Sequence, residues 1–128
     1  MVSAEIEVYV DVSNLQPVDR FEWERWLRRV KMPAPLKYLG AIAAQYGDAD
    51  GSNVRPGVER LARVMCISER TVKRSLSDLR DWGFLQRTKQ GNRHAKQADV
   101  YRLTVPSNLM DLPMLDPDEK EYPPPQSG

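Results

Sequence analysis

The sequence predicts an α+β fold that is mainly helical and carries a small β-hairpin. Four segments place apolar residues at the three- and four-residue spacing of helices that bury one face. Two short segments rich in β-branched and aromatic residues follow them and flank a polar loop. With 128 residues and 41% hydrophobic content, the chain is large enough for one core. We therefore expect a single modest domain with tails.

The N-terminal region, residues 1–33, is predicted to form a strand and an extra helix. Residues 5–12, EIEVYVDV, alternate between apolar and polar side chains, which is typical of a half-buried strand. Asp19 can cap the following helix, and Pro33 ends it. The apolar face of this helix consists of Trp23, Trp26, Leu27 and Val30. We expect this unit to brace the rest of the domain or to form a dimer interface.

Residues 34–105 are predicted to form the main unit, which begins with two helices. The first runs from about Pro35 to Tyr46 along a continuous apolar stripe, and the turn-forming stretch GDADGSN ends it. Pro56 fits the first turn of the second, shorter helix. The apolar face of that helix consists of Val58, Leu61, Ala62 and Met65.

A third helix and a hairpin complete this unit. Ser68 is a good N-cap for helix 68–82, and Gly83 can supply the left-handed residue that ends it. The inward face of the helix consists of Val72, Leu76 and Leu79. Residues 84–88 and 99–105 then predict two strands joined by the loop KQGNRHAKQA. The order helix, tight turn, helix, hairpin is that of a winged helix-turn-helix.

Charge is distributed unevenly along the chain. The net charge is only +1, but residues 1–19 and residues 111–128 each carry −4, whereas residues 20–110 carry +9. Clustered Lys and Arg displace the counterions that condense on nucleic acid, so we expect a polyanionic partner for the basic body. An ordinary solvated surface is the alternative interpretation.

Candidate DNA-binding residues lie on helix 68–82 and on or beside the wing, residues 88–98. An α-helix fits the major groove of B-DNA and offers its N-terminal residues to base edges. The candidates on the helix are Ser68, Glu69, Arg70, Thr71, Lys73, Arg74 and Ser77. Arg70 and Arg74 are predicted to bind guanine in bidentate fashion, whereas the Thr71 and Ser68 hydroxyls suit a phosphate or one base edge.

The wing candidates are predicted to lie along a minor groove or the phosphate backbone. They are Arg87, Lys89, Asn92, Arg93 and Lys96. Gly91 is expected to allow the turn at the tip of the hairpin.

Residues 55–106 resemble the helix-turn-helix modules of phage and plasmid replication proteins and of small bacterial regulators. The shared pattern is an LA pair, a turn, S.RTV.R.L..L...G.L.R, a basic wing and a Y.L strand. The helix from Pro35 to Tyr46 resembles the first helix of that family. The matching residues are Leu61, Ala62, Ser68, Arg70, Thr71, Val72, Arg74, Leu76, Leu79, Gly83, Leu85, Arg87, Tyr101 and Leu103.

The resemblance implies a winged helix fold that binds double-stranded DNA, usually as a dimer on repeated half-sites. One departure from the pattern is Cys66, which stands at the turn position where the family most often has Gly. A left-handed backbone is unfavourable but accessible for a non-glycine residue.

The function predicted from these features is sequence-specific binding of double-stranded DNA by a homodimer that regulates transcription. An accessory factor for replication, partition or transfer of a plasmid or phage is an alternative. A second alternative is a protein-interaction module. In that case the acidic, Pro-rich segment 106–128, predicted to be a flexible tail, would dock on a protein partner.

An enzyme is not expected. The sequence shows no nucleophile–base constellation, no metal-ligand spacing and no phosphate-binding glycine loop, so we expect neither a cofactor nor a metal. It also lacks a signal peptide and any run of roughly 18 apolar residues. Together with the single cysteine, this predicts a cytoplasmic protein without membrane contact, associated with the nucleoid through DNA.

Overall fold

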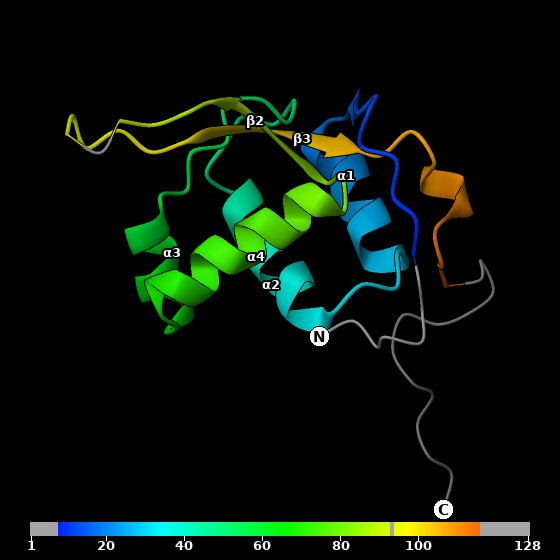
Figure 1. Ribbon diagram of the computed structural model, residues 1–128, viewed down its shortest axis with the longest axis horizontal. Coiled ribbons are helices and arrows are strands. Elements are labelled where there is room, and N and C mark those ends of the chain that lie inside the picture. The colour runs from blue at the N-terminus through cyan, green and yellow to red at the C-terminus, as the bar shows by residue number, and fades with distance from the viewer. Residues whose placement is uncertain (1–7, 93, 116–128) are drawn as a thin grey trace, which may run out of the picture.

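The computed structural model describes residues 8–92 and 94–115 and has an α+β fold (Figure 1). The helices in this part of the chain are α1 (Arg20–Arg29), α2 (Ala34–Ala44), α3 (Val58–Met65) and α4 (Glu69–Asp81). The strands are β1 (Gln16–Pro17), β2 (Leu85–Lys89) and β3 (Val100–Val105), and a short 3₁₀ helix, η1 (Leu109–Asp111), follows them. The predicted class, mainly helical with a small hairpin, is confirmed at this level.

The sheet is antiparallel with strand order β1-β3-β2, so β3 lies in the centre. The β2–β3 hairpin extends past the helices, with α4 below it in Figure 1 and the connection to α3 nearby. On the side of β3 away from β2 lies Val54, in the segment before α3. Val54 and Tyr101 exchange two backbone hydrogen bonds there, of 2.9 and 2.8 Å. The hairpin is therefore held at its base along the β3 edge, by β1 and by Val54.

One hydrophobic core connects the helices with the sheet. It contains Trp23, Leu39, Leu61, Leu79, Phe84 and Leu103, each 0 or 1% exposed. The indole of Trp23 donates a hydrogen bond of 2.8 Å to the carbonyl of Phe84 and packs edge-on against its ring. The α1 helix thus belongs to the same core as residues 34–105, and Trp23 faces the interior of its own chain.

The start of α1 agrees with the sequence prediction, whereas the strand predicted before it is not observed. The Asp19 carboxylate accepts the Glu22 N–H at 2.8 Å and caps the helix. The part of segment 5–12 that is described, residues 8–12, forms no strand, and the strand in this region is β1 instead. The reason is a side chain: Asn108 donates to the Tyr9 carbonyl and accepts the Asp11 N–H, both at 2.8 Å. These bonds occupy backbone groups that a strand ladder would use.

Helices α2 and α3 differ from prediction at their ends. The α2 helix ends at Ala44, before the predicted end at Tyr46. Tyr46 lies in the turn that follows, and its N–H donates a hydrogen bond to the Ala43 carbonyl. The N-cap of α3 is Gly57, with a φ of 73°, so Pro56 precedes the helix instead of lying in its first turn. None of the helices in residues 8–92 and 94–115 has the length and apolar character needed to cross a bilayer.

The α4 helix agrees closely with its prediction. The Ser68 hydroxyl accepts the Thr71 N–H at 3.1 Å, and Gly83 ends the helix region with a φ of 76°. The turn before the helix contains Cys66 in the left-handed region, with φ 57° and ψ 43°. A Cβ on Gly83 would also lie 2.8 Å from Pro106, so this position requires glycine twice over.

The segment 106–115 corrects the prediction of a flexible tail starting at residue 106. Leu109 and Leu112 are buried, at 8 and 4% exposure. The Lys31 N–H donates to the Pro113 carbonyl at 2.8 Å, and the Leu115 N–H donates to the Arg29 carbonyl at 2.9 Å. Apolar residues in this acidic segment therefore dock on the end of α1. The remainder of the predicted tail, residues 116–128, lies outside the described residues, as do residues 1–7 and Arg93.

Candidate nucleic-acid interface

The exposed face of α4 carries the predicted contact residues. Its buried face consists of Val72, Ser75, Leu76 and Leu79, which fixes the helix on the core. The exposed residues are Ser68 at the cap and then Glu69, Arg70, Thr71, Lys73, Arg74 and Ser77. Among the described residues, no hydrogen bond or ion pair engages the side chains of Arg70, Lys73 and Arg74. The first half of α4 therefore offers three exposed cationic groups from a fixed backbone.

The two hydroxyls predicted to bind phosphate or a base edge also cap the helix. The Ser68 Oγ accepts the Thr71 N–H, and it lies 2.9 Å from the Thr71 Oγ1. This arrangement fixes the first turn of α4. The hydroxyl-bearing end and the cationic face consequently keep a defined orientation relative to each other.

The β2–β3 hairpin places the remaining candidates on an extended arm. Its base is anchored by Leu85, Tyr101 and Leu103, which are 2, 6 and 0% exposed. Pairing becomes irregular between Arg87 and Lys89, where the register shifts. Beyond this irregularity the side chains of Lys89, Asn92 and Lys96 are exposed.

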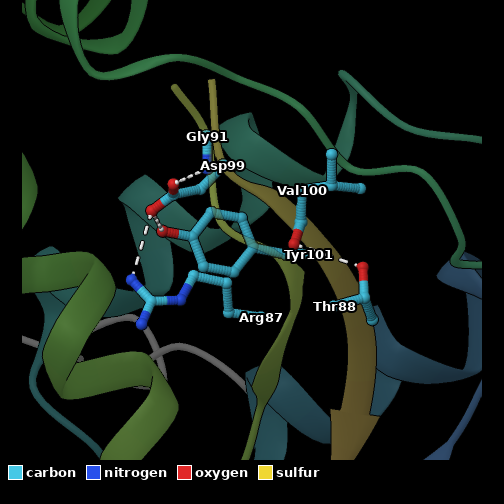
Figure 2. A network of polar contacts seen from close by, with 6 residues as sticks. All are labelled: Arg87, Thr88, Gly91, Asp99, Val100 and Tyr101. Atoms are coloured by element: carbon cyan, nitrogen blue, oxygen red, sulfur yellow. Dashed lines mark hydrogen bonds and ion pairs between the residues drawn. The ribbon is translucent and has the colours of Figure 1, made fainter. Parts of the chain in front are cut away.

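Asp99 ties the arm together where the strands separate (Figure 2). Its carboxylate accepts the Gly91 N–H at 2.6 Å and lies 3.5 Å from both the Arg87 guanidinium and the Tyr101 hydroxyl. Burial, followed by the charge of Asp99, raises the pKa of Tyr101 above its ordinary value. Arg87 thus has an acidic partner, unlike the cations on α4.

The loop at the hairpin tip, which precedes Asp99 in the sequence, is closed by its own hydrogen bonds. The Asn92 carbonyl accepts the Gln97 N–H at 2.9 Å, and the Asn92 side-chain oxygen accepts the N–H groups of His94 and Ala95 at 2.9 and 3.3 Å. Asn92, predicted as a DNA contact, therefore also organises the loop. Composition alone does not indicate this role, although an Asn two residues before a turn amide is the usual sequence signal for it.

Gly91 serves the loop in a different way from the predicted one. Its φ is not in the left-handed region, which Lys96 occupies instead with a φ of 54°. A Cβ on Gly91 would lie only 2.2 Å from the Gln97 carbonyl oxygen. Glycine is needed there because the two sides of the loop approach closely.

Arg55 is a further cation beside the arm that sequence reasoning did not include. Together with Lys89 and Lys96 it lines a hollow of about 280 Å³ between the hairpin and the segment before α3. Arg55 stands outside any periodic pattern, so the sequence gives no signal for this placement. Arg60, by contrast, stacks over the Tyr46 ring at 4.1 Å and donates to the carbonyls of Pro56 and Arg55.

The chemistry available in this region is cationic contact and hydrogen bonding. Within residues 8–92 and 94–115, no group of three His, Cys, Asp or Glu side chains is placed to hold a metal ion. Comparisons of the chain with protein-family models, with curated proteins and with solved structures find no match. The geometry and charge of the chain itself are therefore what indicates its function.

Proposed function

We propose that this protein binds double-stranded DNA sequence-specifically, with α4 in the major groove and the β2–β3 hairpin on the phosphate backbone or in the adjacent minor groove. In this proposal the fold is a winged helix-turn-helix, α4 is its recognition helix and the hairpin is its wing. The observation that carries the proposal is the exposed cationic first half of α4. There Arg70, Lys73 and Arg74 have no acidic partner among the described residues.

Two physical effects favour a DNA-binding role for this face of α4 over an ordinary solvated surface. When exposed Lys and Arg side chains bind a polyanion, they release its condensed counterions, and this release contributes favourable binding free energy. A guanidinium can also donate two parallel hydrogen bonds to guanine O6 and N7, which selects that base. Because Val72, Leu76 and Leu79 fix α4 on the core, Arg70 and Arg74 would meet a base edge without reordering the helix.

The role we assign to this binding is transcriptional regulation by a cytoplasmic homodimer on repeated half-sites. Spacing of such half-sites follows the two-fold symmetry of the protein. The same contacts would serve an accessory factor for plasmid or phage replication, partition or transfer. A protein-interaction module would differ in one respect, because its function would survive loss of the basic residues on α4.

Selection from a randomised duplex library tests the proposal directly. The bound fraction is sequenced, and binding is repeated at two salt concentrations. Enrichment of an inverted or direct repeat is the expected result, and it gives the half-site spacing. Salt-sensitive binding without an enriched sequence would contradict sequence-specific recognition. Absence of duplex binding would contradict the whole proposal and favour the protein-interaction alternative.

Substitutions then separate base contacts from backbone contacts on the selected duplex. Arg70→Ala and Arg74→Ala should each weaken specific binding by about 1–3 kcal/mol and relax the preference at one base position. Lys96→Ala should weaken all sequences alike and lower the salt slope by about one. Arg25→Ala removes the same charge from α1 and serves as the matched control. Equal weakening by all three test variants, without loss of base preference, would exclude α4 as the groove-reading element.

A further inference from the structure

A cationic hollow lies where the hairpin tip meets the segment that leads into α3. The residues that line it include Arg55, Lys89, Lys96 and Gln97, together with Gly91 and Ala98. No Asp or Glu of the described residues lines it. Arg55 and the two lysines come from segments more than thirty positions apart in the sequence. The fold therefore concentrates positive charge here that no local sequence pattern reveals.

Hydrogen bonds to backbone groups fix both walls of the hollow. On one wall, the Arg55 N–H donates to the Tyr46 carbonyl at 3.0 Å, and the Arg55 carbonyl accepts from the Arg60 guanidinium at 2.7 Å. On the other wall, Asp99 holds Gly91 at 2.6 Å and Asn92 holds Gln97 at 2.9 Å. A site whose walls are fixed in advance loses little entropy when a ligand enters.

The surroundings of the hollow favour an anion. Three like charges around one cavity repel one another, and a bound anion removes that repulsion. The nearby Asp99 does not line the hollow, and Arg87 at 3.5 Å partly balances the charge of its carboxylate. The N-terminus of α3 also lies alongside: a Cβ on Gly57, its N-cap, would be 3.9 Å from the Ala98 Cβ. The positive end of a helix dipole adds to the attraction for negative charge.

We propose that this hollow binds a phosphate group through Arg55, Lys89 and Lys96, and that in the DNA complex this group is one phosphate of the duplex backbone. The inference rests on the proposed function for the source of the phosphate. Arg55 supplies the planar fork that suits two phosphate oxygens, and the lysines supply point charges. Because Lys89 and Lys96 belong to the arm, a phosphate bound here fixes the arm against the backbone.

Binding of the selected duplex by the full chain, measured across a salt series, tests Arg55. Arg55→Ala should weaken binding roughly threefold to tenfold, as expected for one exposed charge-assisted contact. It should also lower the salt slope by about 0.9, the value for one phosphate of B-DNA. Arg55→Lys should restore the slope more fully than the affinity, because it keeps the charge and loses the fork. Arg25→Ala on α1, which does not border the hollow, should change neither quantity.

Neutralising one phosphate at a time identifies the bound group. Duplexes that carry a single methylphosphonate linkage are titrated with the wild-type chain and with Arg55→Ala. One linkage should weaken the wild type and leave Arg55→Ala unaffected, since the two changes remove the same contact. The result that would overturn the inference is normal binding of the unmodified duplex together with an equal loss of affinity for both proteins at every methylphosphonate linkage. That result would leave the proposed function intact.

A titration with inorganic pyrophosphate separates failure of the site from failure of the proposed function. Amide chemical shifts of Gly91, Gln97 and Ala98 are followed in the wild type and in Arg55→Ala. Shifts that occur only in the wild type support the phosphate site, even if no duplex binds and the DNA proposal fails. Absence of duplex binding together with absence of these shifts would overturn both.

Discussion

Two peripheral regions of this molecule are held in place by different forces. The α1–η1 region, residues 19–32 and 106–115, is fixed by buried apolar side chains: Trp23, Leu27, Val30, Leu109 and Leu112. The hairpin tip, residues 89–99, has no buried residue among those described and is fixed by hydrogen bonds through Asp99 and Asn92. Stability and the proposed ligand contact are therefore assigned to different parts of the chain.

The magnitudes of the two forces explain why the assignments differ. Burying a large apolar side chain contributes roughly 1.5–3 kcal/mol, whereas one exposed hydrogen bond contributes about 0.5–1.5 kcal/mol net. The first region should thus govern the global free energy of unfolding. The tip should open locally at lower cost, which suits a segment proposed to meet a ligand.

The largest effect is expected from Trp23→Ala in the α1–η1 region. The substitution removes a side chain that is fully buried and the 2.8 Å hydrogen bond to Phe84. It should lower the free energy of unfolding by about 3–5 kcal/mol, as measured by urea denaturation. Phe21→Ala on the same helix is the control, because Phe21 is 76% exposed and should change stability by less than about 0.5 kcal/mol. Similar losses for both variants would refute the assignment of α1 to the core.

A smaller effect is expected from Leu112→Ala, which tests whether segment 106–115 belongs to the folded body. Leu112 is 4% exposed, whereas Met110 nearby is 75% exposed. Leu112→Ala should cost about 2–3 kcal/mol, because its site is peripheral and can partly collapse. Met110→Ala should be close to neutral. If Leu112→Ala were also neutral, the segment would behave as the free tail that its composition predicts.

Sequence patterns predicted the start of α1 and both ends of α4 well, because these features have local causes. Asp19 and Ser68 cap their helices with their own side chains, and Gly83 ends the α4 region with its own backbone freedom. The left-handed backbone of Cys66 lies in the short turn between α3 and α4. Such features depend on residues within one turn of each other, so a single sequence contains the information.

Features that depend on distant residues were not predictable in the same way. The alternating stretch at residues 8–12 is typical of a strand. Its backbone groups at Tyr9 and Asp11 are instead hydrogen-bonded by the Asn108 side chain, which is 99 and 97 positions away in the sequence. The candidate site divides along the same line. The exposure of Arg70 and Arg74 was predictable from helical spacing, whereas the placement of Arg55 beside the hairpin was not.

The hairpin tip offers a third test, in which conformation should change more than stability. Gly91→Ala would place a Cβ 2.2 Å from the Gln97 carbonyl oxygen, so the loop must shift and weaken the bond between Gly91 and Asp99. We expect a cost of about 1 kcal/mol in global stability. Amide exchange should nevertheless accelerate at the hydrogen-bonded N–H groups of Gly91, His94, Ala95 and Gln97, measured by NMR against the exposed control Gln90→Ala. Slow exchange retained at those amides would show that the tip does not depend on this close approach.

The smallest effect is expected at Cys66, which lies in neither of the two regions. Substitutions there test whether backbone conformation alone determines the contribution of an exposed turn to stability. A left-handed backbone costs an L residue roughly 1–2 kcal/mol, and glycine avoids that cost. Glycine also gains about 0.4–1 kcal/mol of unfolded-state freedom, which opposes the benefit. Cys66→Gly should therefore stabilise the protein by about 0.5 kcal/mol in urea denaturation. Cys66→Ser retains the Cβ and should match the wild type, since the thiol is exposed and lies 3.8 Å from the Arg63 carbonyl. A loss of stability in both variants would instead assign a packing role to the sulfur.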